Sequence, residues 1–184
     1  MAEPTGNPIP GDRVLLVDDA DRPLGWAPKL AAHLDGGRLH RAFSVFLFNA
    51  AGQMLLQRRA AGKYHFGGLW TNACCSHPRH GQPLLDSARA RLRHELGIDT
   101  PLEELFGFVY RAEDPASGLT EHEFDHVLAG RFDGTPRPNP DEVSDWEWVD
   151  PQELLADVRR RPARYTPWFK LVLERVLDAG PPRP

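Results

Sequence analysis

The chain has 184 residues, of which 41% are hydrophobic and 26% charged, with 18 prolines and 16 glycines, and these proportions favour one globular domain with many turns. Its formal net charge of -4 comes from 22 basic and 26 acidic residues spread along the sequence, which argues against a nucleic-acid partner. The two cysteines are adjacent, so a disulfide framework is excluded and a reducing, cytoplasmic location is predicted.

The two ends of the chain are predicted to be disordered tails around a single domain, residues 11–178. Residues 1–10 lack the basic start and apolar core of a signal peptide, and residues 179–184 are rich in proline. No apolar run approaches the roughly 20 residues of a membrane span, so no membrane partner is expected. The absence of a coiled-coil or other obvious interface segment favours a monomer.

The first part of the chain is predicted to form two short strands and a helix. Strands are expected at residues 13–17 and 24–26, joined by an acidic turn. A helix is expected over 28–34, because proline suits a first helical turn and two glycines follow the segment. Lys29 and His33 would then share one side of this helix.

The middle of the chain alternates between strand and helix patterns. The segments 41–49 and 53–58 are separated by Ala-Ala-Gly, which suits the loop of a β-hairpin. Residues 84–96 carry apolar side chains at helical intervals, and Gly97 is expected to end this helix.

The remaining elements complete the predicted fold. Further strands are expected at 105–111, 121–132 and 143–149, and helices at 151–160 and 167–177. This order predicts an α+β fold in which helices flank a mixed sheet, an α/β/α sandwich.

Glu121 and Glu123 are spaced as on a strand. Side chains alternate along a strand, so the two carboxylates would point the same way while His122 points the other way. The pair is either a charged edge of the sheet facing solvent or an inward pair that must be neutralised by a cation or share a proton. An isolated Glu-x-Glu is more often the former.

Three histidines could join these carboxylates around a metal. His33, His40 and His77 with the two glutamates would offer three imidazoles and two carboxylates, a set suited to zinc or another divalent transition metal. No tight ligand spacing enforces this arrangement, and any one histidine alone is more often a surface residue.

Two further positions have both a structural and a chemical interpretation. Cys75 is either a buried packing residue, as most free cysteines are, or a proton-exchanging thiol whose pKa a nearby metal lowers, and Cys74 should face away from it. On the helix 84–96, Arg91 and Glu95 are either an ordinary ion pair or partners of a phosphate and a magnesium ion.

Basic and aromatic side chains could complete a ligand site. Lys29, Arg59, Lys63 and Arg91 could surround a diphosphate, although basic residues in loops are usually just solvated. Trp168 is either a core aromatic or a ring that presents its face to a cation.

Taken together, these segments resemble the type I isopentenyl-diphosphate delta-isomerases, a family with a Nudix-like fold, from about Arg13 to Trp168. The most specific motif is Thr71-Asn72-Ala73-Cys74-Cys75-Ser76-His77-Pro78, supported by Glu121-His122-Glu123 and by Arg38-Leu39-His40-Arg41-Ala42-Phe43-Ser44. The resemblance implies interconversion of isopentenyl and dimethylallyl diphosphate, an allylic and homoallylic pair, by a [1,3] proton shift.

The same resemblance implies roles for individual residues. Cys75 and Glu123 would transfer the protons on opposite faces of the substrate, with Tyr110 assisting Glu123. One zinc or manganese ion would be held by His33, His40, His77, Glu121 and Glu123. Magnesium on the diphosphate would be held by Glu95 and the backbone carbonyl of Cys75. Lys29, Arg59, Lys63 and Arg91 would bind the diphosphate, and Trp168 would line the hydrocarbon pocket.

Two departures from family patterns bear on the alternatives. The helix 84–96 has Ser87 and His94 where a hydrolytic Nudix box usually has glutamates. This weakens the alternative of a Nudix diphosphate hydrolase. Phe66-Gly67-Gly68 lacks the aromatic-Pro-Gly pattern common in the family, so this loop is expected to differ in stiffness. A non-catalytic binding module stabilised by metal is the other alternative.

Overall fold

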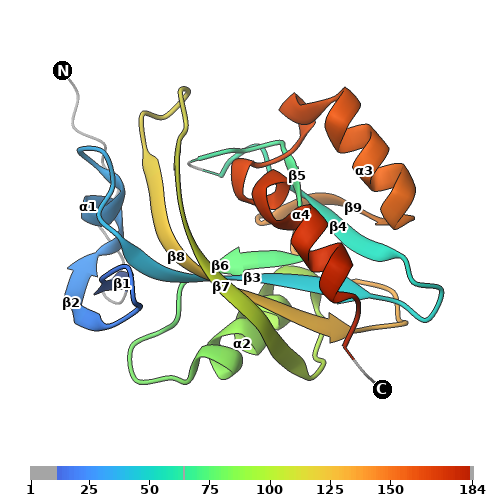
Figure 1. The fold of residues 1–184 in the computed structure, drawn as a ribbon, viewed down its shortest axis with the longest axis horizontal. Helices are drawn as coiled ribbons and strands as arrows, with labels where there is room; N and C mark the ends of the chain where they lie inside the picture. Colours follow the sequence, from blue (N-terminus) through green and yellow to red (C-terminus); the bar gives the residue numbers. More distant parts are fainter. Residues whose placement is uncertain (1–11, 64, 183–184) are drawn as a thin grey trace.

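The structure, a computed structural model, describes residues 12–63 and 65–182. A mixed sheet carries helices on both faces (Figure 1), which confirms the predicted α+β sandwich. The predicted N-terminal tail, residues 1–10, lies outside the described residues. None of the described helices combines the length and hydrophobicity that a membrane span requires.

The described residues form nine strands and four α-helices. The strands are β1 (Arg13–Val17), β2 (Pro23–Pro28), β3 (His40–Phe48), β4 (Met54–Arg59), β5 (Trp70–Thr71), β6 (Cys74–Ser76), β7 (Leu102–Glu113), β8 (Thr120–Arg131) and β9 (Val143–Val149). The helices are α1 (Lys29–His33), α2 (Leu84–Leu96), α3 (Pro151–Arg160) and α4 (Pro167–Ala179), with a 3-10 turn, η1 (Pro162–Arg164), before α4.

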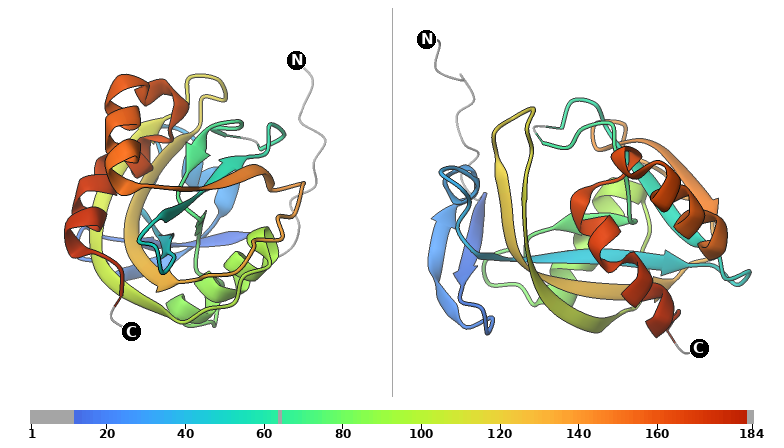
Figure 2. Two further views of the ribbon diagram at one scale, coloured as in Figure 1. Left: turned by 90° about the vertical axis from the view of Figure 1, so that its right-hand side faces the viewer. Right: turned by 45° about the horizontal axis from the view of Figure 1, so that its top comes forward.

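Strand β3 lies at the centre of the sheet and determines where the other segments meet. It runs parallel to β8, with His40 opposite Glu123, and antiparallel to β6, with Ser44 opposite Cys75. β1 pairs with β3 at its start and β4 pairs with it at its end. The centre of the sheet thus joins segments from the first, second and third quarters of the chain (Figure 2).

The two faces of the sheet have separate apolar cores, because side chains alternate along each strand. On one face, Phe46 and Val127 pack with Phe169 and other side chains of α3 and α4. On the other face, Val45 and Leu128 pack with Leu92 and its neighbours on α2. The polar residues at the start of β3 and β8 lie on the same face as α3 and α4, so this apolar core continues directly into the candidate site.

Several predicted elements are confirmed with the bounds that the sequence indicated. The segments 13–17, 84–96, 143–149 and 151–160 form the predicted strand or helix over their full length. Gly97 ends α2 in a left-handed conformation, with φ 66°, and donates its N–H to the carbonyl oxygen of Arg93.

Other predicted bounds were wrong. Pro28 is the last residue of β2 and precedes α1, and that helix ends at His33 instead of Leu34. β5 and β6 were not predicted, because strands of two and three residues show no alternation. α4 continues through Ala179, the first residue of the predicted tail.

Candidate active site

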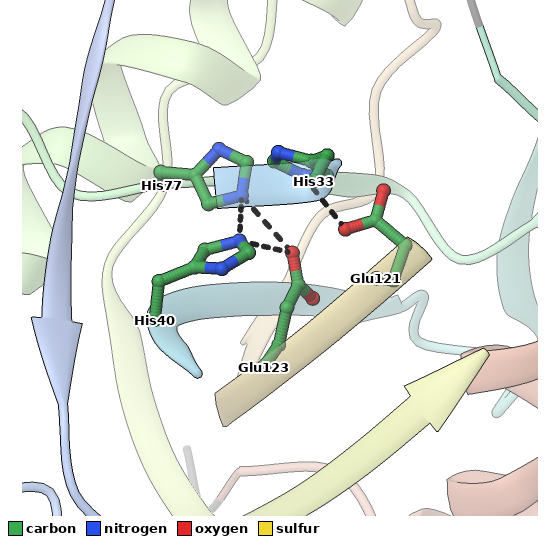
Figure 3. A group of neighbouring side chains, drawn as sticks. All are labelled: His33, His40, His77, Glu121 and Glu123. Atoms are coloured by element: carbon green, nitrogen blue, oxygen red, sulfur yellow. Dashed lines mark hydrogen bonds and ion pairs between the residues drawn. The ribbon is translucent and has the colours of Figure 1, made fainter. Parts of the chain in front are cut away.

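Three imidazoles and two carboxylates converge where β3 and β8 begin (Figure 3). His33 Nε2 lies 3.0 Å from Glu121 Oε2, and His77 Nε2 lies 3.0 Å from Glu123 Oε1. His40 Nε2 lies 3.1 Å from His77 Nε2. One ligand atom from each of the five residues lies within 4.8 Å of all the others, so the structure brings together the whole set that the sequence suggested.

Local backbone contacts orient two of these rings. Nδ1 of His33 lies 2.7 Å from the carbonyl oxygen of Lys29, and Nδ1 of His40 lies 2.7 Å from that of Arg38. A carbonyl oxygen can only accept, so Nδ1 of each ring carries a proton, and Nε2 is the atom that could ligate a metal once it is free of a proton. Both Nε2 atoms face the cluster, as in metal-binding histidines that a backbone carbonyl orients.

The five side chains of this ligand group could hold a cation. Burial would raise the pKa of Glu123 and of Glu121, but hydrogen bonds, to His40 for Glu123 and to His33 for Glu121, lower both. Burial and the nearby His40 hold the pKa of His77 well below its usual range. Two buried carboxylates and three imidazoles supply oxygen and nitrogen donors within 4.8 Å of one another, so the residues present fit a divalent metal.

A cavity opens beside this cluster and gathers most of the other predicted site residues. Its lining includes Lys29, Arg59, Lys63, Arg91, Cys75, His77, Tyr110, Glu121, Glu123 and Trp168. The hydroxyl of Tyr110 donates to Glu123 Oε2 at 2.6 Å, and burial raises the pKa of this phenol well above its usual range. A neutral phenol therefore sits on one carboxylate of the cluster.

Trp168 has both of the roles that the sequence left open. It is 3% exposed and belongs to the apolar core, and its Nε1 donates to Thr71 Oγ1 at 3.1 Å. The guanidinium carbon of Arg59 lies 5.6 Å from the centre of its ring system. The indole therefore joins the apolar wall to the basic side of the cavity.

Cys75 is partly buried, packs against the apolar core and is held by hydrogen bonds. Its thiol donates to Asn72 Oδ1 at 3.2 Å and lies 3.4 Å from Ser44 Oγ, which in turn donates to Asp125 Oδ2. Burial raises the pKa of Cys75 to about 12, so the thiol is protonated in this state. As predicted, Cys74 faces the opposite core.

Glu95 does not line the cavity. It is 3% exposed and accepts hydrogen bonds from Arg91 Nε at 2.6 Å and from Gln57 Nε2 at 2.7 Å. The intrahelical ion pair between Arg91 and Glu95 is therefore present, while Arg91 also lines the cavity.

The sequence analysis missed several residues around the site. His65 Nε2 lies 2.5 Å from Glu121 Oε1, and Glu142 forms ion pairs with Lys63 and Arg91. Asp125 continues the alternation of Glu121 and Glu123 along β8, so the strand pattern itself indicates that it lies on the same face. No local pattern marks His65 or Glu142, because both lie outside the regular elements.

The loop Phe66-Gly67-Gly68, which departs from the family pattern, is held by contacts of Phe66 with Asp114 and Trp168. Phe66 has φ 48°, its N–H donates to Asp114 Oδ2 at 3.1 Å, and its ring meets Trp168 edge to face at 5.4 Å. A Cβ at Gly67 would lie 2.8 Å from the carbonyl oxygen of Ala61, so this close approach requires glycine. The unusual sequence therefore matches a specific backbone path beside the cavity.

Comparisons with known proteins agree with this geometry. The NUDIX domain family pattern matches residues 38–169. The chain is 55% identical over 167 residues to isopentenyl-diphosphate Delta-isomerase 2 of Aromatoleum aromaticum, covering 91% of this chain and 87% of that protein. The chain belongs to the isopentenyl-diphosphate delta-isomerase family. It is 52% identical over 167 residues to the isopentenyl-diphosphate Delta-isomerase of Nocardia farcinica, covering 91% of this chain and 95% of that one.

Solved structures support the Nudix fold of this isomerase family member. The structure of DR0079 from Deinococcus radiodurans matches with a TM-score of 0.71 and 25% identity, over 89% of this chain and 98% of that chain. A MutT protein from Methanosarcina mazei matches with a TM-score of 0.62 and 15% identity, over 74% and 91%. The predicted family is confirmed, it is a family of enzymes, and it implies a divalent metal that the histidine and glutamate cluster could hold.

Proposed function

We propose that the protein interconverts isopentenyl diphosphate and dimethylallyl diphosphate. The observation that carries the proposal is a single cavity shared by Cys75 and Glu123, which His77 and Glu121 of the five-residue ligand group also line. The two side chains come from β6 and β8, which pair with opposite edges of β3. Membership of the isomerase family supports the same assignment.

The proposed reaction moves one carbon–carbon double bond without breaking the diphosphate. Glu123, which is ionised before substrate binds and must first take up a proton, adds that proton to the terminal methylene with Tyr110 as its hydrogen-bond partner, and Cys75 removes a proton from the carbon nearer the diphosphate. One proton enters and one leaves, so no oxidant or reductant is needed. The reverse reaction exchanges the two duties.

The protonation state of Cys75 bears on these duties. The protonated thiol of Cys75 is ready to donate in the reverse direction, and must lose its proton before it acts as a base. The positive charge of Arg59 favours the thiolate. The apolar wall around Trp168 excludes water from the tertiary carbocation that protonation of the alkene would form.

We propose two metal sites in this chain. His33, His40, His77, Glu121 and Glu123 would hold one zinc or manganese ion, which when bound would neutralise the buried carboxylates and raise the acidity of the proton donor. Glu95 and the backbone carbonyl of Cys75 would hold magnesium with the substrate diphosphate. Glu95 would first have to exchange at least one of its hydrogen bonds, to Arg91 or Gln57.

Basic residues at the cavity are proposed to bind the diphosphate. Lys29, Arg59, Lys63 and Arg91 line one cavity, so their charges converge although the chain is acidic overall. We further propose that residues 11–178 act as one catalytic domain, as a monomer in the cytoplasm.

The decisive experiment follows hydrogen at the substrate. The purified protein is incubated with isopentenyl diphosphate, magnesium, and zinc or manganese in deuterated water. We expect dimethylallyl diphosphate that carries new deuterium, with no release of phosphate. Phosphate release would favour a hydrolase. Bound metal without turnover or label, beside an active control enzyme, would favour a binding module.

A further inference from the structure

Glu142 places a fixed negative charge among the cations that face the cavity. Its carboxylate forms an ion pair with Lys63 Nζ, lies 2.7 Å from Arg91 Nη2 and lies 3.4 Å from His94 Nε2. The side chain is 16% exposed. It lines a neighbouring pocket that shares Lys29, Lys63 and Arg91 with the cavity of Cys75 and Glu123.

The backbone holds this carboxylate in place from two sides. The carbonyl oxygen of Glu142 accepts the N–H of Ala60, just after β4, at 2.9 Å. Its own N–H donates to Asn139 O at 3.0 Å, and the N–H of Asn139 donates to Glu95 O at the end of α2 at 2.8 Å. These backbone hydrogen bonds therefore fix the position of Glu142 relative to β4 and α2.

A carboxylate in this position acts differently on two forms of one ligand. A free diphosphate carries several negative charges, and Glu142 repels each of them while competing for Lys63 and Arg91. A diphosphate that has bound a divalent cation has lost two of those charges, and the cation itself is attracted to the carboxylate. The penalty that Glu142 imposes is then largely cancelled.

We infer that Glu142 makes the diphosphate site selective for the metal-complexed substrate over the free anion. This inference rests on the proposed function, because it takes Lys63 and Arg91 as diphosphate ligands. The alternative is that Glu142 only holds these two cations in position, in which case its loss would weaken binding of both forms alike.

Calorimetric titration with inorganic pyrophosphate, in magnesium-free buffer and with excess magnesium, distinguishes a selective role of Glu142 from a purely positioning one. For Glu142→Gln we expect affinity for free pyrophosphate to rise about tenfold, and affinity for the magnesium complex to change by less than about threefold. Glu103→Gln is the matched control, because it makes the same change of side chain and net charge at an exposed position of β7 that lines neither pocket. It should leave the ratio of the two affinities as in the wild type.

Several outcomes would overturn the inference. Equal weakening of both forms, an unchanged ratio, or no pyrophosphate binding by the wild type in magnesium would each do so. Circular dichroism checks that Glu142→Gln is folded, and Glu142→Ala takes its place if it is not. Deuterium uptake with an unchanged ratio would reject the role of Glu142 and leave the isomerase. A shifted ratio without deuterium uptake would support the role of Glu142 and reject the isomerase activity.

Discussion

Cys74 and Cys75 are adjacent in the sequence, and their side chains lie on opposite faces of the sheet. Cys74 is fully buried in the core that α2 covers, and Cys75 faces the cavity on the other side of the sheet. Burial raises the pKa of both thiols. A chemical role is therefore available to one of them, and the pair provides its own control.

Cys75→Ala should lower kcat for isomerisation by about 10²- to 10⁴-fold, because it removes one proton-transfer group. Cys74→Ala should leave kcat within a few-fold of wild type, since that side chain does not line the cavity. Steady-state kinetics under saturating metal measures both. Wild-type turnover in Cys75→Ala would remove the thiol from the mechanism.

His65 should act through Glu121, whose Oε1 it contacts at 2.5 Å. Partners that orient a ligating carboxylate typically affect metal affinity by about 10- to 100-fold, so His65→Ala should weaken zinc or manganese binding by that amount. Competition with a chromophoric chelator measures the affinity. His80→Ala is the control, because its ring packs on Trp26, outside the ligand group. Equal losses in the two variants would contradict the role of His65.

At the scale of elements, local signals account for some of the fold. Helix α2 was predicted with its bounds because apolar periodicity coincides with a following Gly97, and the structure shows that Asp150 caps the start of α3 by accepting the N–H groups of Gln152 and Glu153. β5 and β6 exist because they pair with β4 and β3, and pairing across the chain leaves no mark in two or three residues.

In the candidate site, too, local patterns indicate some of the contacts, and pairing between distant segments produces the others. Strand alternation indicates that Glu121 and Glu123 share a face, and the resemblance implies that His33, His40 and His77, which the sequence alone offers only as candidates, are their partners. That His40 lies opposite Glu123 depends on the register of β3 and β8, which one sequence does not reveal. Glu142 reaches Arg91 from a loop that is anchored to the end of α2 by backbone hydrogen bonds, and no residue pattern encodes those contacts.

Asp157 joins α3 to the segment that leads into α4. It accepts hydrogen bonds from Arg160, Arg161, Arg164 and Tyr165, the last at 2.7 Å. Burial alone would raise the pKa of Asp157, but these donors hold it well below its usual range. The ionised carboxylate therefore stabilises the connection before the helix that carries Trp168.

Asp157→Asn should lower the free energy of unfolding at pH 7 by about 2 kcal/mol, since it weakens charge-assisted hydrogen bonds. A lowered pKa in the folded state stabilises above the unfolded value of about 4, and this contribution is lost as the pH falls toward the folded value. The difference between wild type and variant should shrink from about pH 4 downward. Urea denaturation at pH 7 and pH 3 measures it, and an equal difference at both would refute the assignment.

At the scale of the whole molecule, metal binding should be linked to folding, because the buried Glu121 and Glu123 repel each other without a cation. Removing metal with a chelator should lower Tm by about 5 to 10 °C, and zinc or manganese should restore it. Differential scanning calorimetry tests this, with His77→Ala as a variant that should respond less. An identical shift in that variant would place the effect elsewhere.

The alignment of β3 with β8 ties the chemistry to the apolar interior. A shift of one residue would turn Val127 and its neighbours out of the core, and a shift of two would preserve the core faces but carry Glu123 about 6.6 Å along the sheet from His40. Insertions or deletions inside either strand would therefore abolish ligation even where the chain still folds. Among related chains, changes of length should accumulate in the loops, and the spacing from His40 to Phe46 and from Glu123 to Val127 should stay constant.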